Sequence, residues 1–205
     1  MRSRAARFFA AAAIFGLSAG AGVCADEGKP QDKPEARQEA PAPRTPAEIR
    51  AELYDRLAAS KDEDETQGLL RLLFAAYAQS GSDTGDLLLE RARKAMSAKD
   101  FEAAGKILDA AIALLPNWAE GWNARATLRW LDDDYDGSMA DIAQTLKREP
   151  RHIGALSGLA MILAQRDKKE DALGVYEHIL AIAPHWKSAE EAADKLRAAV
   201  KGQEL

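Results

Sequence analysis

The feature that most constrains this chain is a set of three prolines, Pro116, Pro150 and Pro184, each 34 residues from the next. Proline cannot continue a helical hydrogen-bond ladder, so each of them marks the end of a helix. A fixed period of this length is typical of stacked helical units, each of which buries its apolar face against its neighbours. The spacing therefore predicts three consecutive repeats: residues 85–118, 119–152 and 153–186.

Within these repeats, small and bulky side chains recur at fixed positions. Positions 8 and 20 carry Ala or Ser, and small residues there let the two helices of a repeat approach closely, because interhelix distance depends on the contacting side chains. Bulky residues at positions 4 and 24 fill the space between successive helix pairs. The recurring residues and the repeat-ending prolines are Leu88, Ala92, Ala104, Leu108, Pro116, Trp122, Ala126, Ser138, Ile142, Pro150, Leu156, Ala160, Ala172, Tyr176 and Pro184.

This pattern resembles the tetratricopeptide repeat (TPR) family over residues 85–186, most clearly in residues 119–150. From residue 45 to residue 200 the apolar spacing alternates helix, short turn and helix, without the alternation of a strand. The predicted fold class is all-α: a TPR helix-turn-helix solenoid of three clear repeats, with a degenerate N-terminal helix pair and a C-terminal capping helix. One departure from the family concerns position 15, where its usual turn glycine is replaced by Lys99, Asp133 and Asp167.

Weaker signals mark the two flanks of the repeats. Thr45, Pro46 and Glu48 combine an N-cap, a first-turn proline and a capping-box acid, so a helix begins there. Residues 46–84 match the repeat only in part, and we interpret them as a degenerate helix pair that caps the N-terminal end of the stack. Residues 187–201 are apolar on one side and polar on the other, which is typical of a C-terminal capping helix.

The N-terminal segment carries an export signature. Residues 1–25 have a basic start, a short apolar stretch and small residues at the end, which predicts a signal peptide cleaved before Asp26. An uncleaved membrane anchor and lipidation at Cys24 are the alternatives. Residues 26–45 combine charge with prolines and have too little apolar surface to fold, so we expect a disordered tether. The expected location is the periplasm of a Gram-negative bacterium, or the membrane if the N-terminus stays attached.

Charge and motif content argue against several function classes. Removal of the signal peptide would take the net charge from −5 to −8, and an acidic chain without a basic stripe does not suit nucleic acid. The lone cysteine would leave with the signal peptide, so neither a disulfide nor a thiolate site is expected. The three histidines, His152, His178 and His185, lack the spacing of a helical zinc site. We predict no enzyme, no metal and no cofactor.

The resemblance to TPR proteins implies where a partner would bind. In that family the first helix of each repeat lines a concave groove through positions 2, 5, 9 and 12. Trp130 would be its centre, although packing between helices is the competing interpretation for an aromatic residue at helical spacing. A carboxylate clamp for a partner's C-terminus is not expected, because Arg93 is the one basic residue at the clamp positions. The candidate groove residues are Asp86, Leu89, Arg93, Met96, Glu120, Asn123, Thr127, Trp130, Ser157 and Met161.

Three functional hypotheses follow from these features. The first is a scaffold or adaptor that binds proteins or peptides of the cell envelope and supports envelope assembly or integrity, an analogy at the level of the fold. The second is a structural subunit of a multiprotein envelope machine for secretion, pilus formation or cell-wall synthesis. The third is an accessory factor to an envelope enzyme. Contact with the membrane would be indirect, or would run through a retained N-terminus.

Overall fold

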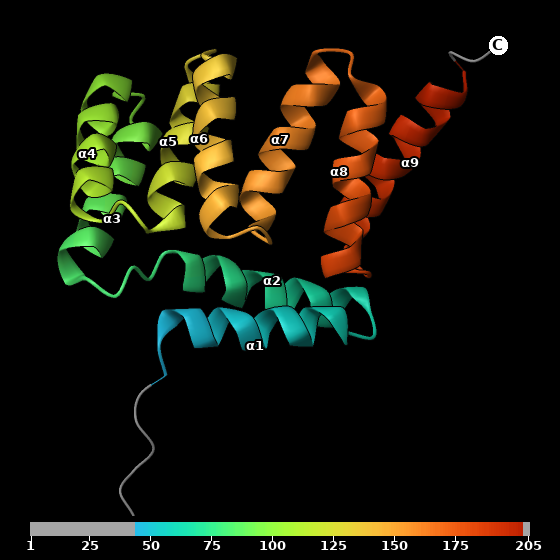
Figure 1. Cartoon of the computed structure of the whole chain (residues 1–205), viewed down its shortest axis with the longest axis horizontal. Helices are drawn as coiled ribbons and strands as arrows, with labels where there is room; N and C mark the ends of the chain where they lie inside the picture. Colours follow the sequence, from blue (N-terminus) through green and yellow to red (C-terminus); the bar gives the residue numbers. More distant parts are fainter. Residues whose placement is uncertain (1–43, 203–205) are drawn as a thin grey trace, which may run out of the picture. The chain divides into compact units, whose positions relative to one another are not determined.

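The computed structural model describes residues 44–202 (Figure 1). That part of the chain is helical throughout and contains no strand, which confirms the all-α prediction. The signal peptide and nearly all of the tether lie outside the described residues. No helix within 44–202 is long and apolar enough to cross a membrane. The helices are α1 (Pro46–Ala58), α2 (Glu63–Tyr77), α3 (Asp83–Ser97), α4 (Phe101–Leu114), α5 (Ala119–Leu131), α6 (Tyr135–Arg148), α7 (Ile153–Gln165), α8 (Lys169–Ile182) and α9 (Lys187–Lys201).

The three predicted repeats are the helix pairs α3–α4, α5–α6 and α7–α8, which stand side by side in Figure 1. The second helix of each pair ends two residues before its proline, so Pro116, Pro150 and Pro184 terminate helices as expected. In the second repeat, the Ser138 hydroxyl donates a hydrogen bond of 2.9 Å to the Ala126 carbonyl. The small residues at positions 8 and 20 of all three repeats are buried: Ala92, Ala104, Ala126, Ser138, Ala160 and Ala172.

The turn inside each repeat uses a left-handed residue at the position where the family commonly has glycine. Lys99, Asp133 and Asp167 have φ angles of 60°, 60° and 59°. A side chain in this conformation is crowded against the backbone, which costs roughly 1–2 kcal/mol, although Asp relieves part of the cost through local hydrogen bonds. The Tyr135 hydroxyl donates such a bond to Asp133. Lys99 is therefore the strained member of the three.

Lys99→Gly is expected to raise the free energy of unfolding by about 0.5–1 kcal/mol, because glycine adopts this φ without steric cost. Thermal or urea unfolding of the purified protein measures the change. The matched control is Ala98→Gly one residue earlier, where φ is −81° and glycine is expected to lower stability by about 0.5 kcal/mol. Destabilisation by both substitutions would contradict the assignment of strain to Lys99.

The N-terminal helix pair differs from the predicted cap. The α1–α2 hairpin runs across the ends of the repeat helices (Figure 1) rather than continuing the stack ahead of α3. Its buried leucines and tyrosines form one core with residues of α7, α8 and α9, whereas α3 and α4 belong to a separate core. An ion pair of 3.5 Å between Arg50 and Glu149 joins α1 to the end of α6.

Side-chain size explains this placement. Position 20 of the degenerate unit carries Leu70, whereas the clear repeats have Ala or Ser there. The larger side chain prevents α1 and α2 from packing as closely as the helices of a clear repeat, so the pair does not match the stack at α3. Both helices instead offer a broad apolar face. That face covers Ile153, Leu156, Ile179 and Ile182 of the third repeat, all of which are buried. Burial of this apolar surface outweighs continuation of the regular stack.

Helix α9 closes the C-terminal end of the solenoid, as predicted. It packs on α8, and Ala189 and Ala193 are its buried residues. Its opposite face carries Glu190, Asp194 and Lys195, which are exposed. A polar outer face of this kind is what a terminal unit of a repeat protein needs.

Candidate partner-binding groove

A pocket of about 230 Å³ lies between α5 and α7, with part of α6 behind it. Among the predicted groove residues it brings together Asn123, Thr127, Trp130, Ser157 and Met161. Trp130 is half-buried, whereas Met161 is 46% exposed at the rim. The complete lining is Asn123, Ala126, Thr127, Trp130, Ser138, Ile142, Gly154, Ser157, Gly158, Met161 and Ile162. None of these residues carries a formal charge at neutral pH.

Two of the remaining groove predictions are wrong about accessibility. Leu89 is 1% exposed and belongs to the core of the first repeat together with Ala92, Ala104 and Leu108. Glu120 is 6% exposed, and its carboxylate is occupied by neighbouring side chains. The groove positions of the TPR family place both residues on first helices of repeats, but their burial depends on which neighbours cover them. Neither can be a first contact for a partner.

The other predicted residues of the first repeat lie outside the pocket. Asp86 caps the turn before α3, since its carboxylate accepts a hydrogen bond of 2.7 Å from the Ser80 amide. Met96 is partly buried against the core of the first repeat. Arg93 is half-exposed, and its guanidinium donates to Glu120 over 2.6 Å. The part of the predicted groove that forms a pocket is therefore the part contributed by the second and third repeats.

A buried polar chain connects the edge of this pocket to the α1–α2 hairpin. The Asn123 amide donates to Glu120 over 2.9 Å, and His152 Nε2 lies 3.2 Å from the same carboxylate without the alignment of a hydrogen bond. His152 is fully buried and caps α7, because its Nδ1 accepts from the Ala155 amide. Its ring stacks on Tyr77 with 3.9 Å between ring centroids. His152 thus joins α5, α7 and α2.

The buried series of polar contacts continues from His152 through two tyrosine hydroxyls. Those of Tyr54 and Tyr77 lie 2.6 Å apart, Tyr54 donates to the Arg151 carbonyl, and the Ile153 amide donates to Tyr77. Burial raises the pKa of both tyrosines above the ordinary value of 10, which keeps both hydroxyls neutral. Sequence reasoning missed His152 and Tyr77 as a pair. The available signal was the position of His152 directly before an apolar helix, where an N-cap is expected.

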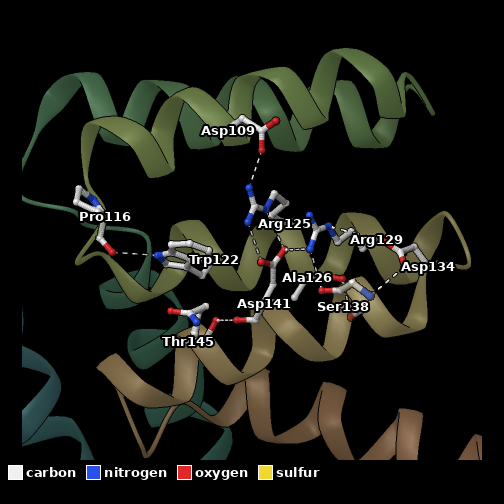
Figure 2. A network of polar contacts seen from close by, with 12 residues as sticks. Asp109, Pro116, Trp122, Arg125, Ala126, Arg129, Asp134, Ser138, Asp141 and Thr145 are labelled. Atoms are coloured by element: carbon white, nitrogen blue, oxygen red, sulfur yellow. Dashed lines mark hydrogen bonds and ion pairs between the residues drawn. The ribbon is translucent and has the colours of Figure 1, made fainter.

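A second polar network holds the second repeat together (Figure 2). Arg125 of α5 forms a two-point contact with Asp141 of α6, at 2.9 Å from Nε and 2.8 Å from Nη2. Arg129 reaches the same buried carboxylate over 3.1 Å. On its other side Arg125 donates to Asp109 of α4 over 2.7 Å. The hydrogen bond with Asp141 raises the pKa of Arg125, which stays charged.

Trp122 lies beside this network and is half-buried. Its ring lies 5.0 Å from the Arg125 guanidinium and 4.6 Å from that of Arg148, both cation–π distances. Its indole donates to the Pro116 carbonyl over 3.0 Å (Figure 2). Trp118 is buried in the core of the first repeat, and Trp186 packs on the hairpin core. Among residues 44–202, no group of three or more His, Cys, Asp and Glu could hold a metal ion.

Comparison with known proteins decides the family. A TPR repeat-containing protein of Rhizobium etli is 38% identical over 151 residues, which cover 74% of this chain and 74% of that protein. The chain belongs to the TPR repeat proteins. Proteins of this family generally mediate protein–protein interactions, and their repeats are typically non-catalytic scaffolds that bind other proteins or peptides. No family model matches the chain.

One solved structure supports the fold of this TPR protein. The TPR domain of Arabidopsis OM64 is 18% identical, with a TM-score of 0.51 over 56% of this chain and 94% of that domain. The crystal structure of MamA protein is 15% identical, with a TM-score of 0.46 over 76% of this chain and 88% of that one. At 18% identity, the similarity to the OM64 domain concerns the fold alone.

Proposed function

We propose that this TPR protein is an exported adaptor that binds proteins of the bacterial cell envelope through the α5–α7 pocket and supports envelope assembly or integrity. The observation that carries the binding role is the pocket itself, which combines Trp130 with the exposed Met161. Aromatic residues and methionine are enriched at protein interfaces, and a tryptophan beside a pocket is a common energetic anchor. The envelope location rests on the export signature of residues 1–25, with cleavage before Asp26.

Site-specific photo-crosslinking in cells tests this proposal. A photoreactive amino acid at Thr127, which is exposed at the pocket, should capture envelope proteins, and Trp130→Ala should reduce the capture about tenfold or more. Met161→Lys serves as a second variant, because its exposed side chain can change without disturbing the core. The control position is Lys106, which is exposed on α4 and absent from the pocket.

Several outcomes would contradict the proposal. If Lys106 captured the same proteins as Thr127, or if neither variant reduced the capture, the pocket would not be the binding site. Adducts with cytoplasmic proteins alone would contradict the envelope location. N-terminal sequencing of the protein purified from cells separates cleavage before Asp26 from retention of the signal peptide.

A different observation favours a structural subunit of a multiprotein envelope machine. The α1–α2 hairpin shares its core with the third repeat, and the first repeat carries Leu87 and Leu114 at 44% and 49% exposure. Exposed apolar side chains at the end of a repeat stack suit a permanent neighbour. The size of the protein in gentle envelope extracts distinguishes the two roles, since a subunit would co-migrate with a large complex and an adaptor would not.

A further inference from the structure

Two glycines shape the pocket between α5 and α7. Gly154 and Gly158 lie one helical turn apart on α7, and both line the pocket. A Cβ atom at Gly158 would lie 3.4 Å from Ile142 Cδ1, and one at Gly154 would lie 3.4 Å from the His152 ring. Glycine inside a helix costs about 1 kcal/mol relative to alanine, so such a pair indicates that space is needed.

The chemistry of the lining limits what can enter. The inner wall is formed by Ala126, Ile142 and Ile162, which are buried, and the polar members at the pocket are the neutral Asn123, Thr127 and Ser157. The charged groups beside Asn123 neutralise each other, because Arg93 donates to the Glu120 carboxylate. A charged side chain entering the pocket would lose water and find no counter-ion, which is costly. An apolar side chain would gain by burial.

The size of the pocket agrees with this chemistry. Its volume is about 230 Å³, and an apolar protein cavity of about 150 Å³ is large enough to hold a benzene molecule. One aromatic or leucine side chain therefore fits. Trp130 is the aromatic residue of the lining, and aromatic side chains prefer offset or edge contact with one another.

Resting on the proposed function, we propose that the α5–α7 pocket is a specificity socket for one bulky, uncharged apolar side chain of the partner, held open by Gly158. The partner segment is accordingly apolar at the anchoring position rather than acidic or basic. The inner wall makes contact with that side chain, and the neutral rim is left to hydrogen-bond with the partner's backbone.

Titration with short peptides tests the socket. The probes are N-acetylated, C-amidated Gly/Ser peptides that differ in one central residue: Phe, Leu, Lys or Glu. The readout is the NMR signal of the Trp130 indole N–H, which detects weak binding at the pocket. The Phe and Leu peptides are expected to bind about tenfold or more tightly than the Lys and Glu peptides.

Variants of Gly158 have a matched control in the same fold. Gly158→Leu should fill the socket and weaken binding of the Phe peptide about tenfold, and Gly158→Ala should have an intermediate effect on binding. Gly174→Ala, at the equivalent point of α8 and with nothing within 4 Å of its added Cβ, should leave binding unchanged. Both alanine variants should raise the melting temperature, because alanine is more favourable than glycine inside a helix. At Gly158 the added methyl group is tolerated if Ile142 Cδ1 shifts slightly. A Gly158→Ala protein that is at least as stable and binds more weakly separates the socket from a purely structural role.

Three results would overturn the inference: equal binding of charged and apolar peptides, no binding of any peptide, or full binding to Gly158→Leu. The proposed adaptor function is read separately, from crosslinks at Thr127 in cells. If Thr127 crosslinks to envelope proteins but the four peptides bind equally, the socket is rejected and the adaptor function is retained. If the apolar peptides bind more tightly but no envelope protein is crosslinked, the socket is retained and the adaptor function is rejected.

Discussion

Asp141→Ala is expected to lower the free energy of unfolding by about 3 kcal/mol or more. The Asp141 carboxylate is buried, accepts hydrogen bonds from Arg125 and forms an ion pair with Arg129, so its removal leaves two guanidinium groups without their shared partner. Breaking a buried ion pair by deleting one member typically costs about 3–5 kcal/mol, because the remaining charge is uncompensated. Urea unfolding followed by circular dichroism measures the loss.

Asp109→Ala is the matched control for this substitution. Asp109 contacts the same Arg125 from α4, but its side chain is 65% exposed. Water compensates a partner lost at the surface, so the expected change is below about 1 kcal/mol. Equal effects of the two substitutions would mean that burial of the Asp141 carboxylate does not set the stability of the α5–α6 pair.

Leu73→Ala is expected to cost about 3 kcal/mol and to loosen the third repeat more than the first. Leu73 is fully buried in the core that the α1–α2 hairpin shares with α7, α8 and α9. Truncating a buried leucine loses transfer free energy and leaves a cavity, at about 2–5 kcal/mol. Hydrogen exchange measured by mass spectrometry should increase in α7–α9 more than in α3–α4, because local opening follows shared packing.

Leu72→Ala one residue earlier is the control, since Leu72 is 53% exposed. Its expected effect is within about 0.5 kcal/mol, as for most surface substitutions. Faster exchange in α3–α4 than in α7–α9 after Leu73→Ala would show that the hairpin supports the first repeat, as the sequence had suggested, and would contradict the arrangement in Figure 1.

The repeats themselves were predictable from sequence because their determinants are local. A proline stops its own helix, and alanine at positions 8 and 20 permits close approach of two helices joined by a short turn. Pro116, Pro150 and Pro184 follow helix ends, and Ala92, Ala126 and Ala160 are buried. The left-handed residues Lys99, Asp133 and Asp167 occupy position 15 of their repeats, where the family usually has a turn glycine.

The candidate groove was predictable in part. The resemblance to TPR proteins placed the groove on the first helix of each repeat, and five of the residues predicted in this way line one pocket between α5 and α7. It could not show that Leu89 lies in the core or that Glu120 is occupied by Arg93, because burial depends on elements distant in sequence. Asp141 looks like any polar helix residue in the sequence, and its role requires Arg125 on another helix.

By itself, then, the sequence determined the helical class and the register of three TPR units, whereas the candidate groove face came from the resemblance to the family. Only the tertiary structure decided where the α1–α2 hairpin docks and how wide the pocket is. The hairpin is held by contacts such as Tyr54 with Arg151, which are separated by 97 residues. The pocket is open because Gly158 faces Ile142 across a helix interface. Local patterns determine local geometry, but which apolar faces meet depends on the burial available to the whole chain.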